Sequence, residues 1–513
     1  MKYLYALAIL CGLVLWSSCR NDFETVPSTG NLEFSRDTIF LDTIFSNIGS
    51  STYNLKVYNR SDDDVRIPTL QLGDGEASNY RLNVDGVAGK VFENVEILAK
   101  DSIFIFVETT VDINTQTEDN SFLYTDQIKF DAGGNEQNVE LVTLVQDAIF
   151  LFPDLDSEGM VGTISLGLDE EGNPILVEGF ILEEDELTFT NEKPYVIYGF
   201  AAVPSGETLV VNAGARVHFH ENSGIIVAED ATIQSNGAPS SDPVLLENEV
   251  IFEGDRLEPS FADVPGQWST IWLTAGSTNN TFTNTTIKNA IAGMLMDSND
   301  GDLTLSLRDV QIYNSSNVGL LARNGNVYGE NVVINNSGQS SLAISLGGTY
   351  NFNHCTFANY WTNSFRSFPT VQIDNIIPDV AEADLIEANF TNCIIYGSEP
   401  RELGFAQSAN ASLLFNFNFS NCLIAFDDPN GDFTGLPNYD FSNNTLYTNS
   451  VFNQDPVFQD VTLNNFNIKR NESGAEGIGQ GGVLPLLDLN GTTRNTTNPD
   501  AGAYETIEFP DTD

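Results

Sequence analysis

Two patterns of hydrophobic and polar positions divide the chain. Between residues 31 and 147, apolar and polar residues alternate in runs such as Thr52–Asn59 and Ile103–Thr109, separated by Asn, Asp and Gly. A period of two with turns at this spacing predicts the strands of a small antiparallel β-sandwich. From about residue 196, short apolar runs recur between Asn, Gly, Ser and Thr, without an amphipathic helical stretch of useful length. The chain is therefore predicted to be all-β.

The second pattern contains a short repeat. Each copy begins with an apolar or aromatic residue, has Asn, Asp or His near its middle and ends with Ile or Phe. Its six copies are Phe282–Ile287, Leu307–Ile312, Tyr328–Ile334, Phe352–Phe357, Phe390–Ile395 and Phe419–Ile424. The polar positions 284, 309, 331 and 354 are 25, 22 and 23 residues apart, and the steps to 392 and 421 are 38 and 29. Intervals in the low twenties fit one solenoid turn of three short strands, and the longer steps leave room for inserted loops.

A solenoid of this kind predicts columns of like side chains. One turn cannot bury its own apolar residues, but turns stacked at roughly 4.8 Å share a continuous core. The expected aromatic column is Phe282, Phe352, Phe390 and Phe419, and the expected aliphatic column is Ile287, Ile312, Ile334, Phe357, Ile395 and Ile424. The polar repeat positions are expected at a bend, where an Asn side chain forms hydrogen bonds along the ladder. Cys355, Cys393 and Cys422 share one repeat position and are expected to stack inward.

Segments at both ends of this region resemble a known family. Val203–Val210, Asn212–Phe219 and Gly266–Trp272 are similar to the opening of bacterial parallel β-helix proteins, and Asp455–Phe458, Gly474–Gly479 and Asp500–Glu505 are similar to their ending. The resemblance implies a right-handed parallel β-helix of the pectin-lyase-like type over residues 196–505, with an acidic tail at 506–513. Because this fold hosts lyases, hydrolases, adhesins and binding proteins alike, it does not fix the activity.

The regions before the β-helix are assigned in the same way. Residues 31–147 resemble the immunoglobulin-like domains at the N-termini of bacterial surface proteins, through the order of strand, Asn47–Gly49 and the run Leu55–Asn59. This domain is expected to act as a spacer or docking module. Residues 148–195 are rich in acid and glycine and are interpreted as an acidic connecting region.

The N-terminus has the composition of a lipoprotein signal peptide. Lys2 precedes an apolar run from Tyr3 to Trp16, and Ser17 and Ser18 lead into Cys19. The segment Leu15–Cys19 resembles a bacterial lipobox, which implies a signal peptide at 1–18, a lipidated Cys19 and a tether at 19–30. Cleavage by an ordinary signal peptidase is the alternative. The charged stretch Arg20–Glu24 is similar to the residues that follow the cysteine in surface-exported lipoproteins of Bacteroidota. The expected location is the outer membrane, through the lipid anchor.

The net charge of the chain limits the kinds of molecule that it is expected to bind. The chain has 72 Asp and Glu against 21 Lys and Arg, a formal net charge of -51. Such a field repels phosphate backbones, so no nucleic acid is expected as a partner. It also repels acidic polysaccharides unless divalent cations bridge the two surfaces. Polysaccharides or surface proteins remain as expected partners.

The residues that could carry chemistry are few. Lyases of this fold need a Lys or Arg base, and Lys288, Arg308 and Arg323 fall in neighbouring coils, where they form a candidate basic face. Asp297, Asn299, Asp300 and Asp302 gather oxygen ligands that suit calcium, although the glycine is misplaced for an EF-hand. No cofactor is required, and calcium is the one that the sequence leaves open. The catalytic residues stay unknown.

Two further constellations favour a structural interpretation. His218 and His220 alternate on a predicted strand and are expected to point to the same face, but a packing role is favoured over a metal pair. Asp427 and Asp428 precede a turn composition and are interpreted as a loop.

Three functions follow as hypotheses. The first is a surface lipoprotein that binds glycans or makes surface contacts without catalysis. The second is a calcium-assisted polysaccharide lyase or glycosidase, which requires the three basic residues to line one groove. The third is a structural stalk or adhesin that binds protein partners.

Overall fold

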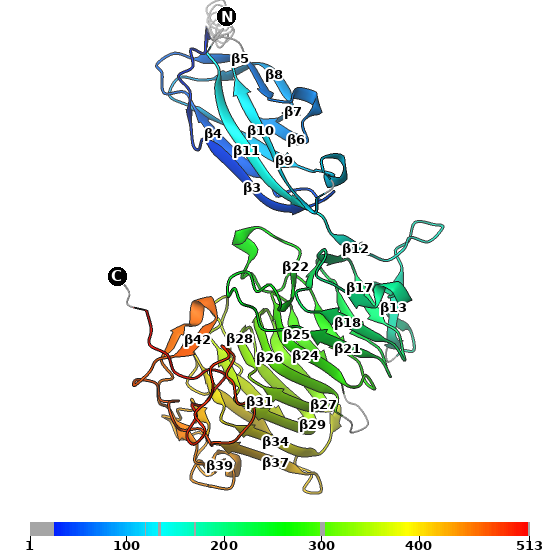
Figure 1. Ribbon diagram of the computed structural model, residues 1–513, viewed down its shortest axis with the longest axis vertical. Coiled ribbons are helices and arrows are strands. Elements are labelled where there is room, and N and C mark those ends of the chain that lie inside the picture. The colour runs from blue at the N-terminus through cyan, green and yellow to red at the C-terminus, as the bar shows by residue number, and fades with distance from the viewer. Residues whose placement is uncertain (1–24, 118, 132–134, 169–170, 298–302, 511–513) are drawn as a thin grey trace, which may run out of the picture. The chain divides into compact units, whose positions relative to one another are not determined.

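The computed structural model describes residues 25–117, 119–131, 135–168, 171–297 and 303–510. Contacts divide the chain between Asp147 and Ala148 into two compact units. Strands dominate both units (Figure 1), which confirms the all-β prediction. The only helices in the described residues are single 3-10 turns: η1 (Gly75–Ala77), η2 (Ile113–Thr115), η3 (Glu184–Glu186), η4 (Pro259–Phe261), η5 (Pro437–Tyr439) and η6 (Val461–Leu463).

The first unit consists of two sheets around one core. Alternation explains its burial: in β9, Ile103, Ile105 and Val107 are buried, whereas Phe104 and Phe106 between them are exposed. Most pairs are antiparallel, but β1 pairs with β5, and β3 with β11, in parallel. One sheet contains β1 (Val26–Pro27), β5 (Val65–Leu72), β10 (Ser121–Phe130), β11 (Gln137–Gln146) and β3 (Thr38–Phe45), with β8 (Val91–Ile97) on β5. The other contains β2 (Glu33–Phe34), β4 (Tyr53–Tyr58), β9 (Ser102–Thr109), β6 (Tyr80–Val84) and β7 (Val87–Gly89).

The second unit is built from three parallel ladders, here named A, B and C, which the chain visits in that order, once per coil. Ladder A contains β12 (Ile149–Leu151), β16 (Tyr195–Ile197), β19 (Arg216–Phe219), β22 (Val250–Gly254), the second halves of β24 (Asn280–Lys288) and β26 (Leu305–Ser315), β28 (Val333–Ser337), β30 (Thr356–Asn359), β35 (Ile394–Gly397), β38 (Leu423–Ile424) and β40 (Val451–Phe452). Ladder B contains β14 (Pro174–Ile181), β17 (Phe200–Val203), β20 (Gly224–Val227), β23 (Thr270–Leu273), β25 (Ala292–Met296), the first halves of β27 (Val318–Glu330) and β29 (Leu342–Asn353), β31 (Val371–Asp374) and β36 (Leu403–Ala406).

Ladder C is formed by the remaining strand segments of each coil. It contains β15 (Thr188–Phe189), β18 (Thr208–Asn212), β21 (Thr232–Asn236), the first halves of β24 and β26, the second halves of β27 and β29, β34 (Leu385–Thr391), β37 (Phe415–Ser420) and β39 (Tyr447–Thr448). In the described residues of the second unit, three antiparallel pairs add to the ladders: β13 (Thr163–Leu168) on the first part of β14, β32 (Ile376–Ile377) with β33 (Ala381–Glu382), and β41 (Phe458–Asp460) with β42 (Asn465–Ile468).

The predicted aliphatic column is present in the ladders, and the predicted aromatic column is present without Phe282. The register aligns Phe352, Phe390 and Phe419. The ring centroids of Phe352 and Phe390 are 5.4 Å apart, and those of Phe390 and Phe419 are 4.8 Å apart. Leu307 and Gly329 separate Phe282 from this stack. The aliphatic column is continuous through successive register partners: Ile287, Ile312, Ile334, Phe357, Ile395 and Ile424.

The bend positions of the repeat all adopt left-handed backbone. Residues 284, 309, 331, 354, 392 and 421 have φ between 42° and 55°, a conformation that Asn and Asp tolerate better than most residues. Side-chain hydrogen bonds join neighbouring coils here, because Asn331 Nδ2 donates to Asp309 Oδ1 at 2.7 Å and Asn392 Nδ2 to His354 Nε2 at 2.9 Å. The predicted role of these polar residues at the bend is confirmed.

The ladders do not have the limits expected from the sequence. They begin at β12 rather than at residue 196, so residues 148–195 belong to the stack instead of connecting two domains. Strands of two or three residues, such as β12 and β15, are too short to produce a visible alternation. The last ladder strand is β40, which ends at Phe452 rather than near residue 505.

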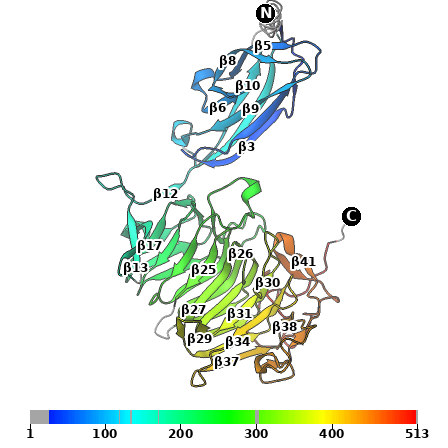
Figure 2. The same ribbon diagram turned by 180° about the vertical axis from the view of Figure 1, so that it is seen from behind.

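The segment after β40 folds back along the outer face of ladder A (Figures 1 and 2). Outward residues of ladder A are apolar here, and Val333 and Ala358 pack against Phe466 and Tyr504 of this segment. Its backbone is held at the bend, because Asn392 Nδ2 donates to the Gln480 carbonyl at 3.0 Å. This segment therefore covers part of the outer face of ladder A.

Candidate functional site

The three candidate basic residues lie on three different faces. Lys288 belongs to ladder A, Arg323 to ladder B and Arg308 to ladder C. Their sequence separations, 20 and 15 residues, are shorter than one coil of 22 to 25 residues, so successive members fall on different ladders. Each is also paired with a carboxylate: Lys288 with Glu253, Arg308 with Glu330 and Arg323 with Asp297. The predicted common basic face is therefore wrong.

Ladder B instead carries an outward stripe of apolar side chains. The register aligns Ile226, Trp272, Leu295, Leu321 and Ala343 in five successive coils. All but Ile226 are partly exposed. Trp272 points outward because its neighbours Ile271 and Leu273 point into the core, as alternation along a strand requires. These five residues are named the ladder B stripe.

A cavity of about 520 Å³ lies against the N-terminal end of the stripe. Trp272 and Ile226 line it from the ladder, and Ile164 and Leu166 line it from the β13–β14 hairpin. Glu229 and Asp297 are also in the lining. The result is a mainly apolar pocket with two carboxylates in its lining, a composition that suits small organic ligands.

Hydrogen bonds fix the orientation of the Trp272 ring. Trp272 Nε1 donates to Asp297 Oδ2 at 2.8 Å, and Arg323 Nε donates to Asp297 Oδ1 at 2.6 Å. Both carboxylate oxygens of Asp297 are thus engaged, and Arg323 balances its charge. Asp297 was a calcium candidate; the other three, Asn299, Asp300 and Asp302, lie outside the described residues.

A second carboxyl group lies further along ladder B, at the end of β31. Asp374 Oδ1 accepts a hydrogen bond from Gln372 Nε2 at 2.5 Å. Burial raises the pKa of Asp374 from an ordinary 3.8 to about 6, against the smaller opposing effect of the Gln372 hydrogen bond. Gln372 is the register partner of Ala343, so this polar pair continues the ladder B stripe.

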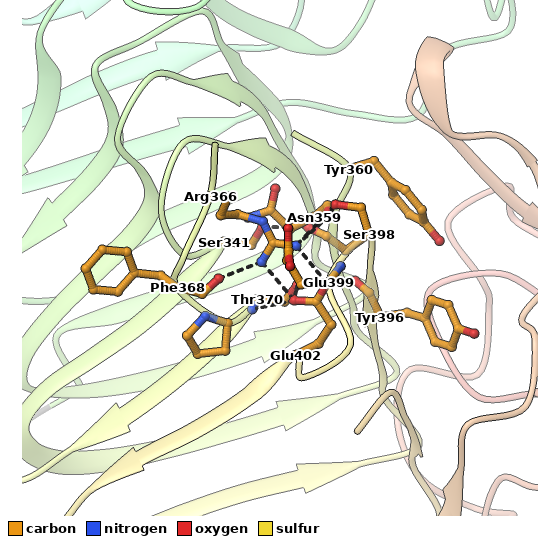
Figure 3. A network of polar contacts seen from close by, with 12 residues as sticks. Ser341, Asn359, Tyr360, Arg366, Phe368, Thr370, Tyr396, Ser398, Glu399 and Glu402 are labelled. Atoms are coloured by element: carbon orange, nitrogen blue, oxygen red, sulfur yellow. Dashed lines mark hydrogen bonds and ion pairs between the residues drawn. The ribbon is translucent and has the colours of Figure 1, made fainter. Parts of the chain in front are cut away.

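A loop that contains a buried ion pair precedes β31 (Figure 3). Arg366 and Glu402 form a bidentate pair with N–O distances of 2.7 and 2.8 Å, and Thr370 also donates to Glu402. In Figure 3, Phe368 points away from the side on which Tyr360 and Tyr396 lie. Phe368 is 46% exposed, and Phe365 is 87% exposed. Sequence reasoning missed this loop, because nothing in the composition around Arg366 marks a buried charge.

The histidines do not form a metal pair. His218 is buried, with Nδ1 3.2 Å from the Gly254 carbonyl, whereas Nδ1 of the half-exposed His220 lies 2.7 Å from Asp255 Oδ2. Within the described ranges, no three His, Cys, Asp or Glu residues are placed to hold a metal ion. His354 is fully buried, and this burial lowers its pKa to about 3.

The cysteines of the repeat stack inward as predicted. Cys355, Cys393 and Cys422 are free thiols without solvent exposure, and the Cys393 amide donates to Cys422 Sγ at 3.4 Å. Burial raises the pKa of the Cys393 and Cys422 thiols well above the usual value. Neither thiol is prepared for nucleophilic attack, which needs a thiolate.

The predicted loop around the acidic pair is also present, since Asp428 accepts hydrogen bonds from the amides of Asp432 and Phe433. Cys19 and the predicted signal peptide lie outside the described residues. No helix in the described part of the chain is long and apolar enough to cross a membrane.

Comparisons with known proteins identify no family. No family model matches the chain, and no curated protein matches it. Among solved structures, a family 123 glycoside hydrolase from Clostridium perfringens is 10% identical with a TM-score of 0.16; the match covers 22% of this chain and 25% of the hydrolase. A PapD-like domain of human CEP192 is 12% identical with a TM-score of 0.15 and coverages of 26% and 94%. The periplasmic chaperone SfaE is 12% identical with a TM-score of 0.16 and coverages of 29% and 83%. Scores this low support no argument about function.

Proposed function

We propose that the protein is an exported surface lipoprotein, anchored through Cys19, which binds neutral glycan chains along ladder B without cleaving them. In this proposal the three ladders form a right-handed parallel β-helix of the pectin-lyase-like type, and the first unit is an immunoglobulin-like spacer. The observation that carries the binding function is the partly exposed ring of Trp272, fixed by Asp297 at the wall of a cavity.

The chemistry of the cavity supports a sugar ligand. A pyranose ring has an apolar face of C–H groups and a rim of hydroxyls, so it needs an aromatic surface with hydrogen-bond acceptors beside it. Trp272 supplies the aromatic surface, and the carboxylate of Glu229, also in the cavity lining, supplies acceptor oxygens. Because the Trp272 side chain is already oriented, little conformational entropy is lost on binding.

The charge of the chain supports a neutral ligand over an acidic one. At a net charge of -51, the field opposes the approach of polyanions. The only Arg of the three candidates that reaches ladder B, Arg323, is neutralised by Asp297. This also disfavours the polysaccharide lyase hypothesis, because the required base is engaged in an ion pair.

The stalk or adhesin hypothesis has its own observation. Phe365 and Phe368 are exposed on a loop that a buried ion pair holds in place. Exposed aromatic side chains on a rigid support are typical anchors of protein interfaces. Phe365 is therefore the residue to vary when glycan binding is separated from protein binding.

Affinity electrophoresis tests the proposal. The soluble part, residues 20–513, is run through native gels cast with different neutral and acidic polysaccharides, with and without calcium, and stained for intact glycan. The proposal expects retardation in at least one neutral glycan, without a cleared zone, which Trp272→Ala abolishes and Phe365→Ala leaves intact. Clearing around the band would show that the protein cleaves the glycan and would contradict the proposal. Migration unaffected by every glycan would favour the adhesin.

A further inference from the structure

A histidine and a carboxylate form a fixed pair at one corner of the second unit. His220 Nδ1 lies 2.7 Å from Asp255 Oδ2, and the Asp255 side chain is only 14% exposed. The ring of Tyr198, from the preceding coil, stacks on the His220 ring at a centroid distance of 4.4 Å and an interplanar angle of 27°. Asp255 and Tyr198 thus hold the imidazole in one orientation and favour the tautomer with the proton on Nδ1.

His220 borders a cavity that is separate from the one at Trp272. This cavity has a volume of about 740 Å³, and its lining includes His220. The walls are mainly apolar: Phe152, Pro153, Val161, Val177, Tyr198 and Phe200. Two carboxylates, Glu178 and Glu221, are also in the lining. The cavity therefore suits a ligand with an apolar group and no negative charge.

The second ring nitrogen of His220 is available for chemistry. In the part of the chain that the structure describes, the His220 ring makes its hydrogen bond through Nδ1, to Asp255, and no hydrogen bond involves Nε2. A histidine whose Nδ1–H is bonded to a carboxylate and whose Nε2 has no partner is arranged as a general base.

We propose that His220 and Asp255 form a hydrolytic site for neutral esters of small apolar acids. Nε2 of His220 takes a proton from a water molecule, whose oxygen attacks the ester carbonyl carbon. When the tetrahedral adduct collapses, the bond from carbon to the alcohol oxygen breaks and the imidazolium returns its proton to that oxygen. The products are a carboxylic acid and an alcohol, and no cofactor is consumed. The side-chain amide of Asn222, also in the lining, is a donor for the oxyanion.

Water is assigned as the nucleophile for a structural reason. Ser269 lines the same cavity, but no hydrogen bond joins it to His220 among the described residues. A serine nucleophile requires that contact with its base. His220 is consequently a catalytic residue in this proposal, and Asp255 is a positioning residue.

The hydrolysis of p-nitrophenyl butyrate by residues 20–513 tests the site. The proposal expects saturable turnover that His220→Ala lowers by about 100-fold or more, as for loss of a general base. Asp255→Asn is expected to lower kcat with little change in KM, and to alter the pH profile of kcat, because it frees the imidazole to adopt the other tautomer. The control is Glu207→Gln, an exposed position in the turn between β17 and β18, which should retain turnover.

Either of two results would overturn the proposal. If the wild type is no faster than His220→Ala prepared in the same way, the pair is only a structural contact. If Ser269→Ala is inactive while its thermal unfolding is unchanged, the enzyme forms an acyl-serine and water is not the first nucleophile. The site is independent of glycan binding, so Trp272→Ala should leave ester hydrolysis unchanged.

Discussion

Arg366 and Glu402 form an ion pair that is closed to solvent, with side-chain exposures of 1% and 0%. The two residues are 36 positions apart and belong to consecutive coils, so the pair fastens the loop before β31 to the coil that follows. Thr370 and the Glu399 amide donate further hydrogen bonds to Glu402. The carboxylate is therefore fully used, which is the condition under which a buried charge is tolerated.

Removing one charge of this pair should destabilise the second unit strongly. We expect Glu402→Gln to lower its free energy of unfolding by about 3–5 kcal/mol, because it leaves the Arg366 guanidinium buried without a counter-charge. Urea unfolding followed by far-UV circular dichroism measures this. Arg401→Gln, which breaks an exposed pair with Asp432, is the control and should cost about 0–1 kcal/mol. Equal losses in the two variants would contradict the role of burial.

The left-handed bend at Asn392 should discriminate between Gly and Ala. Asn392 has a φ of 55°, is buried, and bonds to His354 and to both backbone groups of Gln480. Both variants lose these bonds. Ala is strained on a left-handed backbone because it has a Cβ and no side-chain hydrogen bonds, whereas Gly adopts this backbone without strain. We expect Ala to be less stable than Gly by about 1–2 kcal/mol in urea unfolding. The reverse order would show that the backbone conformation there is not left-handed.

The stacked thiols should resist alkylation until the unit unfolds. Burial raises the pKa of Cys393 and Cys422, so both the thiolate fraction and access are low. We expect iodoacetamide at pH 8 to leave the peptides of Cys355, Cys393 and Cys422 unmodified in the native protein and to label them fully in denaturant. Mass spectrometry of the digested protein reads each site separately. Rapid native labelling of any of the three would contradict the inward stack.

Asp374 should make the second unit less stable as the pH rises. Its pKa in the fold, about 6, lies above the ordinary 3.8, so folding favours the protonated form. Its stabilising contribution is complete below about pH 4 and is lost as the pH passes through 6. Asp374→Asn should therefore stabilise the second unit by about 3 kcal/mol at pH 7.5 and by roughly nothing at pH 4. Urea unfolding at both pH values checks this, and a gain of equal size at pH 4 would contradict it.

The columns of the second unit could be predicted because each repeats one residue type at one position. Phe390 and Phe419, or Ile395 and Ile424, align in the sequence at the same distance from a polar bend residue, and the register preserves that alignment. The left-handed bend at positions such as Asn331 follows from the same repeat.

The candidate site could not be predicted in the same way. Lys288, Arg308 and Arg323 lie on three different ladders. The ladder of each residue depends on where the coil bends, and the spacing of the three residues does not show the positions of the bends. Trp272 was detectable in principle, since Ile271 and Leu273 flank it on a strand and must point inward. The contact of Trp272 with Asp297 could not be predicted from the sequence, because it joins residues that are 25 positions apart.

The most direct test of the central claim is the equilibrium affinity of residues 20–513 for an unbranched neutral oligosaccharide, taken from a polysaccharide that retards the wild type. Isothermal titration calorimetry compares the wild type with Trp272→Ala, Trp272→Phe and Phe365→Ala. We predict that Trp272→Ala weakens binding by about 10-fold or more, the loss of an aromatic contact worth roughly 1.5 kcal/mol. Trp272→Phe should lie between it and the wild type, and Phe365→Ala should equal the wild type. Unchanged affinity in Trp272→Ala would contradict the assignment of ladder B as the glycan-binding face.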